Sequence, residues 1–322
     1  MRGGKVHEHQ VSSEICEKRA KLRREAVSLA KQYEDVIFIG GLNHEQDSEG
    51  NDRRDMKLPY EQDLLVKELL KANPRTVIVL TGGSPVEMGE WIQSAEAVVW
   101  NWYAGTEGGR ALAEVIFGEV NPSGKLPETF YKKHTDCSAH CLGEFPGKKN
   151  VRYSEGVFVG YRYNDSFHIS PQFCFGHGLS YTSFEYRTPE LIQEEGERYV
   201  CCTVVNAGEV EGKETIQIYL APLERKAEEP VQQLKGFEKV TLRPGEEDKD
   251  PVRRKYRRNG DKDRKLIKRH QADHQTIKKI RKNRKAAPRR GNPESLFRGL
   301  LSFDVQRDQL TDLRTALSWK RK

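Results

Sequence analysis

Long hydrophobic runs are absent from this 322-residue sequence. No apolar segment approaches the roughly 20 residues that a membrane-spanning helix needs. The N-terminus, MRGGKVHEHQVSSE, also lacks the apolar core of a secretory signal peptide. We therefore expect a cytoplasmic protein with no membrane partner.

Cysteine is sparse, and its distribution excludes a small disulfide-stabilised fold. Six cysteines are scattered over the chain, which predicts reduced thiols rather than a disulfide framework. Two of them lie with two histidines in residues 134–141, HTDCSAHC, and zinc accepts these ligand types. The spacing is too tight for a zinc-finger pattern, however, and we expect no metal there. The six positions are Cys16, Cys137, Cys141, Cys174, Cys201 and Cys202.

The net charge of +7 conceals two unlike parts. Residues 1–250 contain 31 Lys and Arg against 41 Asp and Glu, a net charge of −10. Residues 251–322 contain 24 against 7, a net charge of +17. Such asymmetry indicates that the acidic part and the basic part have different origins or roles.

The first 120 residues alternate between helical and strand patterns. Amphipathic helices are predicted at 14–34, 61–72 and 106–117, with Gly118 as a C-terminal cap, and a short helix at 86–92. Apolar strands are predicted at 36–39, 76–80 and 97–102. This alternation is typical of a mostly parallel sheet covered by helices. The glycines at 82–83 and 105–109 lack the spacing of a phosphate-binding loop, so we reject nucleotide binding.

Residues 40–59, GGLNHEQDSEGNDRRDMKLP, form an acidic loop directly after the first predicted strand. Ligands of α/β sheets bind at the carboxyl ends of strands. Glycoside hydrolysis needs one carboxylic acid to protonate the leaving oxygen and a second carboxylate across the sugar. Glu49 is a candidate acid, with Asp52 and Arg53 positioned to hold it and tune its pKa. The alternative is a solvated acidic loop or a Ca²⁺ contact.

This loop resembles the one that carries the general acid/base in glycoside hydrolase family 3 β-glucosidases. The match SEGNDR at residues 48–53 assigns that role to Glu49, although Asn51 replaces the aromatic residue that is usual in the family. Further matches are VIVLTGGSPVEM, WNWYAGTEGGRALAEVIFGEVNPSGKLPETF, SEGVFVGYRYND and FGHGLSYTSFEY, and the resemblance covers residues 20–248. It implies a β-glucoside or oligosaccharide substrate and neither cofactor nor metal.

Aromatic residues follow the third predicted strand. Trp100, Trp102 and Tyr103 could shape the substrate site, or some of them could pack in the core. The resemblance also implies a nucleophile on an N-terminal (β/α)₈ barrel, which needs about 250 residues. No part of this sequence resembles the motif of that nucleophile. A separately encoded barrel is therefore a candidate partner.

From residue 199 onward the pattern is that of β structure. Strands are predicted at 199–205, 214–220 and 234–242. The segments VNAGEVEGKETIQIYLAP and LKGFEKVTLRPGEE resemble a fibronectin type III-like domain. After residue 247 the resemblance ends. We weigh three interpretations of residues 251–322: a basic arm for nucleic acid, a disordered tail, or a shifted reading frame. Nucleic acid is the least favoured, and a local helix is expected within 293–322.

The predicted organisation is therefore an α/β-sandwich domain at 1–185, a partial fibronectin III-like β-sandwich at 186–250 and a basic tail at 251–322, expected to be disordered. The first functional hypothesis is a fragment of a retaining β-glucosidase that contributes the acid/base but not the nucleophile. The alternative is a non-catalytic chain that binds carbohydrate or a partner, or an inactive truncated product.

Overall fold

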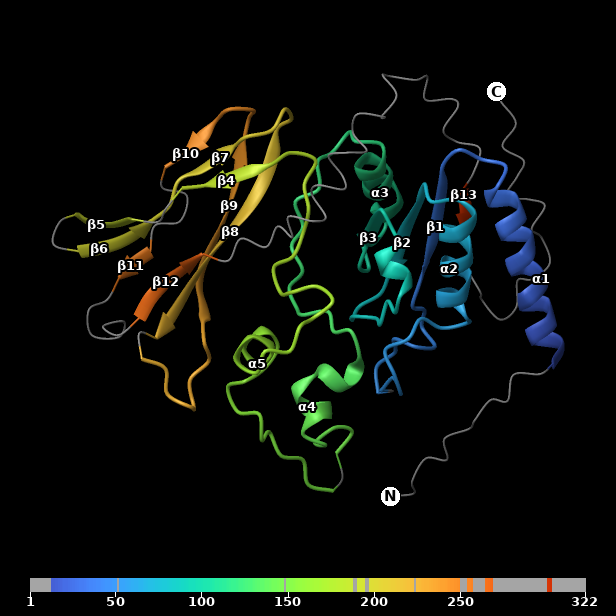
Figure 1. Cartoon of the computed structure of the whole chain (residues 1–322), viewed down its shortest axis with the longest axis horizontal. Coiled ribbons are helices and arrows are strands. Elements are labelled where there is room, and N and C mark those ends of the chain that lie inside the picture. Colours follow the sequence, from blue (N-terminus) through green and yellow to red (C-terminus); the bar gives the residue numbers. More distant parts are fainter. Residues whose placement is uncertain are drawn as a thin grey trace.

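The computed structural model describes residues 13–50, 52–147, 149–187, 190–194, 197–222, 224–249, 254–256, 264–268 and 300–302. Figure 1 shows a layer of helices and parallel strands beside a layer of antiparallel strands. A segment with three short helical turns lies below both layers: η2 (His134–Asp136), α4 (Ser138–Cys141) and α5 (Tyr161–Ser166). No helix in the described ranges is long and apolar enough to span a membrane.

A four-stranded parallel sheet organises the first layer. Its order is β13 (Leu300–Ser302), β1 (Val36–Gly41), β2 (Thr76–Thr81) and β3 (Ala97–Trp100). The three predicted strands are confirmed. The third ends at Trp100 rather than at 102, because Trp102 has a left-handed φ of 46° that interrupts the extended backbone.

Two amphipathic helices cover one face of the sheet. Helices α1 (Ser13–Ala30) and α2 (Gln62–Ala72) pack on each other, and their apolar residues share one core with alternate residues of β1 and β2. Strand periodicity sends Ile37, Ile39 and Val77 to the opposite face, where they are only half-buried. The fully enclosed members of the core are Ala30, Phe38, Val66, Leu69, Ile78, Leu80 and Val86.

The predicted helix at 86–92 is wrong for most of its length. Only η1 (Trp91–Gln93) is helical, as a single 3-10 turn. The backbone N–H of Glu87 instead donates to the carbonyl of Met56 at 2.7 Å, and Val86 and Met88 are buried. The segment therefore packs beneath the acidic loop. Helix α3 (Gly108–Ile116) forms as expected, and Gly118, with φ 80°, follows its C-terminus in the left-handed conformation of a cap.

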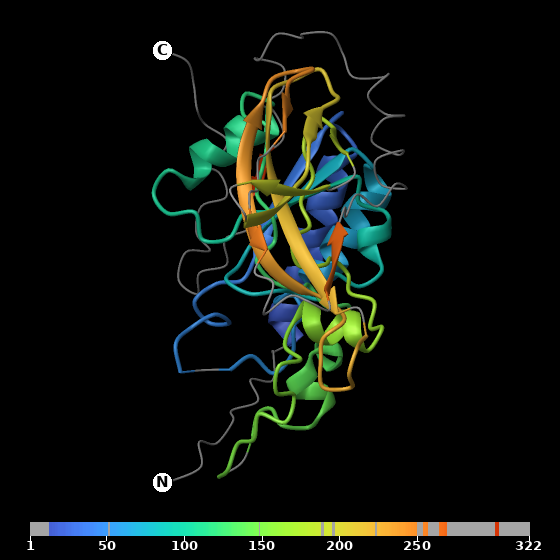
Figure 2. The ribbon, with the colours of Figure 1, turned by 90° about the vertical axis from the view of Figure 1, so that its left-hand side faces the viewer.

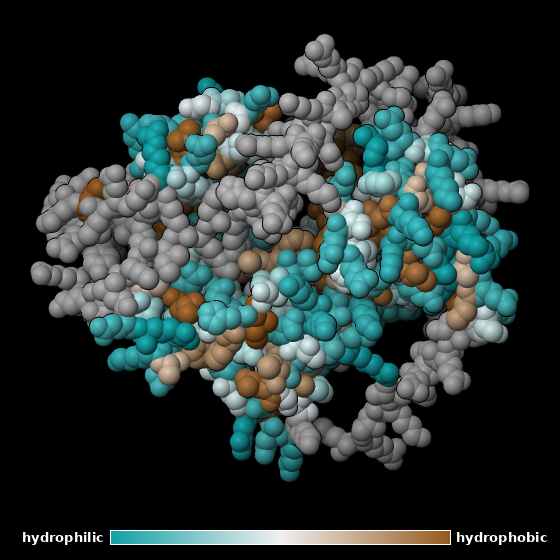
Figure 3. All heavy atoms as spheres, viewed as in Figure 1, coloured by the Kyte–Doolittle hydropathy of each residue, from teal (hydrophilic) through white to brown (hydrophobic). Residues whose placement is uncertain are grey.

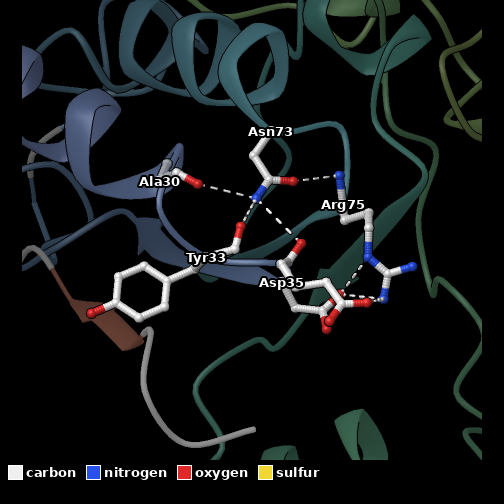
Figure 4. A network of polar contacts seen from close by, with 6 residues as sticks. Ala30, Tyr33, Asp35, Asn73 and Arg75 are labelled. Carbon is white, nitrogen blue, oxygen red and sulfur yellow. Dashed lines mark hydrogen bonds and ion pairs between the residues drawn. The ribbon is translucent and has the colours of Figure 1, made fainter. Parts of the chain in front are cut away.

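Asn73 joins α1, β1 and α2 (Figure 4). Its side-chain nitrogen donates to the carbonyls of Ala30, Tyr33 and Glu34 at 3.1, 2.8 and 3.3 Å, and its side-chain oxygen accepts from the backbone N–H of Arg75 at 2.9 Å. Asn73 is 7% exposed, so water cannot replace these bonds without opening the core. Asn73, which follows the last residue of α2, thus also fixes the turn between α1 and β1.

The chain reaches the second layer through the segment FGHGLSY, residues 175–181. The backbones of Gly176 and His177 bond to Leu126, and Lys125 Nζ donates to the carbonyl of Gly178 at 2.8 Å. A Cβ on Gly178 would lie 2.1 Å from the carbonyl oxygen of Gly124, so only glycine permits this close approach. The sequence match FGHGLSYTSFEY therefore marks the junction between the layers.

Among the described residues, the second layer contains three small antiparallel sheets, and its two longest strands form a hairpin, β8 (Gly212–Pro222) with β9 (Gln233–Leu242) (Figure 2). The sheets have the orders β10-β7-β4, β11-β6-β5 and β12-β8-β9. The other strands are β4 (Phe184–Tyr186), β5 (Glu190–Glu194), β6 (Glu197–Cys201), β7 (Val204–Asn206), β10 (Glu247–Asp248), β11 (Arg254–Tyr256) and β12 (Arg264–Lys268).

Two sequence predictions for the β region need correction. The predicted single strand 199–205 is two strands, because β6 pairs with β5 while β7 pairs with β4 and β10, so the chain changes sheets between them. The local helix expected within 293–322 is wrong at Leu300–Ser302, which pair with β1 as a strand. The rest of that prediction lies outside the described residues. Within 251–322 the structure describes only β11, β12 and β13.

Replacing Asn73 with Ala should lower the free energy of unfolding by about 3 kcal/mol, because buried carbonyls lose their donor. Urea unfolding of the full chain measures the change. Arg75→Ala is the matched control: its ion pair with Asp35, at 2.6 Å, joins two side chains that are 48% and 43% exposed. It should cost less than ~1 kcal/mol. Equal losses in the two variants would contradict the role of Asn73.

Asp63 should make stability depend on pH. Burial raises the pKa of Asp63, although Trp91 Nε1 donates to its carboxylate at 2.7 Å. A carboxyl whose pKa is raised on folding stabilises the protein fully below its unfolded pKa, about 3.9, and this contribution is lost as the pH rises through the folded pKa. Asp63→Asn, measured by urea unfolding, should therefore gain stability relative to wild type between pH 4 and 7. The exposed Glu90→Gln should show no such trend.

Candidate active site

Three loops meet at the carboxyl edge of the parallel sheet. Residues 42–61 follow β1, residues 82–90 follow β2 and residues 101–107 follow β3. The strands are parallel, so these loops lie at one edge, where ligands of α/β sheets bind. The acidic loop occupies the position that the sequence predicted for it.

The first half of the acidic loop is held by Tyr60. Its hydroxyl donates to Glu45 Oε2 at 2.5 Å and accepts from Asn43 Nδ2 at 3.0 Å. The backbone N–H of Leu42 donates to the carbonyl of Thr81 at 2.8 Å, which extends the β1–β2 ladder by one bond. The loop thus leaves the sheet in a defined direction.

The second half of the loop is held by Asp47 and Arg53. Asp47 Oδ2 accepts from the backbone N–H of Gly83 at 2.9 Å and from the hydroxyl of Tyr103 at 2.7 Å. Arg53 Nη2 donates to the carbonyl of Pro85 at 2.7 Å. Sequence analysis predicted a supporting role for Arg53 but did not single out Asp47.

Partial burial perturbs the charged groups around Arg53. Burial lowers the pKa of the Arg53 guanidinium, against the opposing charges of Asp47 and Asp55. Burial raises the pKa of the nearby Glu128 carboxyl, and the charge of Arg53 opposes that rise. Glu128 is a second carboxyl close to the loop that the sequence analysis missed, since it lies in a separate block of the chain.

Glu49 and Asp52 are exposed at the tip of the loop. Glu49 is followed by Gly50, whose φ of 79° turns the chain. A carboxyl at an exposed tip can reach a substrate that binds over the edge of the sheet. The tip thus presents Glu49 outward between the attachments of Asp47 and Arg53.

A hollow of about 270 Å³ lies beside this loop. The acidic loop supplies most of its wall, including Asp52 and Arg53. The opposite wall comes from residues that the sequence analysis did not assign to a substrate site. The complete lining is Gln46, Asp47, Asp52, Arg53, Arg54, Asp55, Met56, Ser84, His134, His140 and Phe145.

His134 and His140 were considered in the sequence only as metal ligands. The structure places both on the hollow, with their rings 5.2 Å apart. His134 Nδ1 lies 3.1 Å from Glu87 Oε1, and burial, followed by the charge of His134, lowers the pKa of His140. Within the described part of the chain, no three His, Cys, Asp or Glu side chains gather in a metal-binding arrangement. No spacing rule could show that this segment folds back onto the acidic loop.

The three aromatic candidates divide between core and site. The rings of Trp100 and Trp102 both pack edge-on against Phe130, at 4.9 and 6.3 Å, and join the main core. The positions of these two rings favour packing in the core over shaping of the substrate site. Tyr103 is 54% exposed and contacts the acidic loop through Asp47.

Family models match part of each layer. Residues 5–161 match the glycosyl hydrolase family 3 C-terminal domain, and residues 214–250 match a fibronectin type III-like domain. The first match contains the acidic loop and both histidines of the hollow. The second contains β9 and most of β8.

Named relatives agree with these matches. The chain is 45% identical over 235 residues to beta-glucosidase BoGH3A of Bacteroides ovatus, which covers 70% of this chain and 31% of the relative. It is 42% identical over 232 residues to thermostable beta-glucosidase B of Acetivibrio thermocellus, again 70% of this chain and 30% of the relative. The chain thus spans about a third of the length of these relatives and corresponds to their C-terminal part.

Solved structures show the same relationship. A beta-glucosidase from Kluyveromyces marxianus in complex with glucose superposes with a TM-score of 0.69 at 39% identity, over 73% of this chain and 28% of that one. Beta-glucosidase 3B from Thermotoga neapolitana, in complex with glucose, superposes with a TM-score of 0.65 at 32% identity, over 78% and 35% of the two chains. This chain therefore carries the C-terminal α/β domain of glycosyl hydrolase family 3, followed by fibronectin type III-like strands.

Proposed function

We propose that this chain contributes the general acid/base to the hydrolysis of terminal β-D-glucosyl residues by a retaining mechanism. Glu49 protonates the leaving oxygen in the first step and activates water in the second. Arg53 and Asp52 support the loop that carries it. The supporting observation is the location of Glu49 at the exposed tip of a loop that is otherwise attached to the sheet edge.

The proposed substrate follows from the relatives. They are named beta-glucosidases, and solved relatives hold glucose. Polar and charged side chains line most of the hollow beside the loop, as suits a ligand rich in hydroxyl groups. Asp52 and the two histidines are the side chains of this chain that we expect nearest to the sugar.

The nucleophile comes, in this proposal, from a (β/α)₈ barrel on the same polypeptide or on a separately encoded one. Retaining hydrolysis needs two carboxyls about 5–5.5 Å apart, and no part of this sequence resembles the family motif of the nucleophile.

The surface offers room for such a neighbour. Apolar atoms reach the surface over α4, α5 and the loop between them (Figure 3), and one face of the parallel sheet is only half-buried. Exposed apolar side chains that gather on one region mark sites of association. The exposed side chains of this region are Leu142, Phe145, Val151, Tyr153, Val157, Val159 and Phe167.

The test joins the full chain to the part of the Bacteroides ovatus relative that it does not match. The chain alone should not hydrolyse an aryl β-glucoside, whereas the fusion should. In the fusion, Glu49→Ala should lower kcat for an alkyl glucoside about 10²–10⁴-fold. For a dinitrophenyl glucoside, whose leaving group departs without a proton, Glu49→Ala should slow the first step much less. Azide should restore the turnover of this substrate by the variant.

Glu25→Ala, which removes an exposed carboxyl on α1 outside the three loops, is the matched control and should leave both substrates unaffected. Turnover by the chain alone would show that it supplies its own nucleophile. Equal losses for alkyl and aryl substrates in Glu49→Ala would remove the acid/base assignment.

A further inference from the structure

The turn after β2 is attached to both sides of the loop tip. On one side, the backbone N–H of Gly83 donates to Asp47 at 2.9 Å. On the other, the carbonyl of Pro85 accepts from Arg53 at 2.7 Å. The tip between these attachments carries the exposed Glu49. The two bonds therefore restrict the positions that Glu49 can take relative to the sheet.

Tyr103 completes the first attachment from the neighbouring strand. Its hydroxyl donates to the same oxygen, Asp47 Oδ2, at 2.7 Å. Burial, and then the hydrogen bond and charge of Asp47, raise the pKa of Tyr103 to about 12. Trp102, directly before it, has a left-handed φ of 46°. One carboxylate oxygen thus links the loops that follow β1, β2 and β3.

The fit at Gly83 is close. A Cβ at this position would lie 2.8 Å from Asp47 Oδ2 and 3.0 Å from Tyr103 Cε2. Any larger residue would displace one of these two groups, so the glycine permits the carboxylate and the ring to approach the backbone together.

We propose that Asp47 is the positioning residue of the acid/base, and that it acts through Tyr103 and Gly83. Glu49 is two residues from Asp47, and two residues of extended chain span at most about 7 Å. Fixing the Asp47 carboxylate therefore confines the Glu49 backbone to a small volume over the sheet edge. The positioning role rests on the proposed function, whereas the attachment itself does not.

The attachment is tested by trypsin cleavage within the loop of the native full chain. Arg53 and Arg54 lie beside the tip, and mass spectrometry follows cleavage at these two sites alone. Asp47→Asn and Tyr103→Phe should each accelerate it about tenfold, the lower end expected for a hydrogen bond to a charged group. Cleavage through local opening tracks the population of the open form.

The double variant should be cleaved no faster than Asp47→Asn, because Tyr103→Phe removes a bond that Asp47→Asn has already weakened. Glu25→Gln and Tyr153→Phe are the matched controls, since both side chains are exposed, Tyr153 at 82%. They should match wild type. Cleavage of Asp47→Asn and Tyr103→Phe at the wild-type rate, or additive acceleration in the double variant, would overturn the attachment.

The positioning role is tested by leaving-group dependence in the fusion described above. Asp47→Asn and Tyr103→Phe should lower kcat for the alkyl glucoside at least tenfold, with little effect on the dinitrophenyl glucoside and little change in KM. Equal losses on both substrates would indicate general damage and overturn the role. If cleavage accelerates but Glu49→Ala shows no leaving-group dependence, the proposed function fails, and the positioning role fails with it, while the attachment stands.

Discussion

The parallel pairing of β1, β2 and β3 is the constraint on which the rest of the α/β layer depends. Parallel strands end at the same edge, so loops from residues 42–61, 82–90 and 101–107 must meet there. The core beneath them holds the strands through Phe38, Ile78 and Leu80, all of which are enclosed. Chemistry at the edge thus depends on a core that takes no part in it.

The second layer is tied to the first through the junction. Lys125 Nζ lies 3.0 Å from Glu214 Oε2, with side chains only 15% and 10% exposed, while it also donates to Gly178. Tyr186 donates to the other oxygen of Glu214 at 2.7 Å, so the buried carboxylate is satisfied from both layers. The backbone N–H of Leu234 donates to the hydroxyl of Tyr161, and the backbone N–H of Val231 donates to the hydroxyl of Ser166, both in α5. The antiparallel strands therefore brace the segment that carries the wall of the hollow.

The acidic loop combines firm attachment with an exposed tip. The loop is attached on both sides of its tip by hydrogen bonds that Tyr60, Gly83, Tyr103 and Arg53 donate. Glu49 itself stays exposed, which leaves its carboxyl accessible from outside the domain. A firmly attached base with an exposed tip agrees with the role proposed for Glu49.

The sequence by itself determined the parallel sheet, the position of the acidic loop after β1 and the family, because these follow from local periodicity and contiguous motifs. It could not determine that Asp47 would meet Tyr103, 56 positions later, or that His134 and His140 would line the hollow. Two helix predictions from sequence were wrong. Residues 86–92 bond to Met56 and are mostly not helical, and Leu300–Ser302 pair with β1 as a strand. Only tertiary structure decided these points, since each depends on contacts between distant segments that no local pattern encodes.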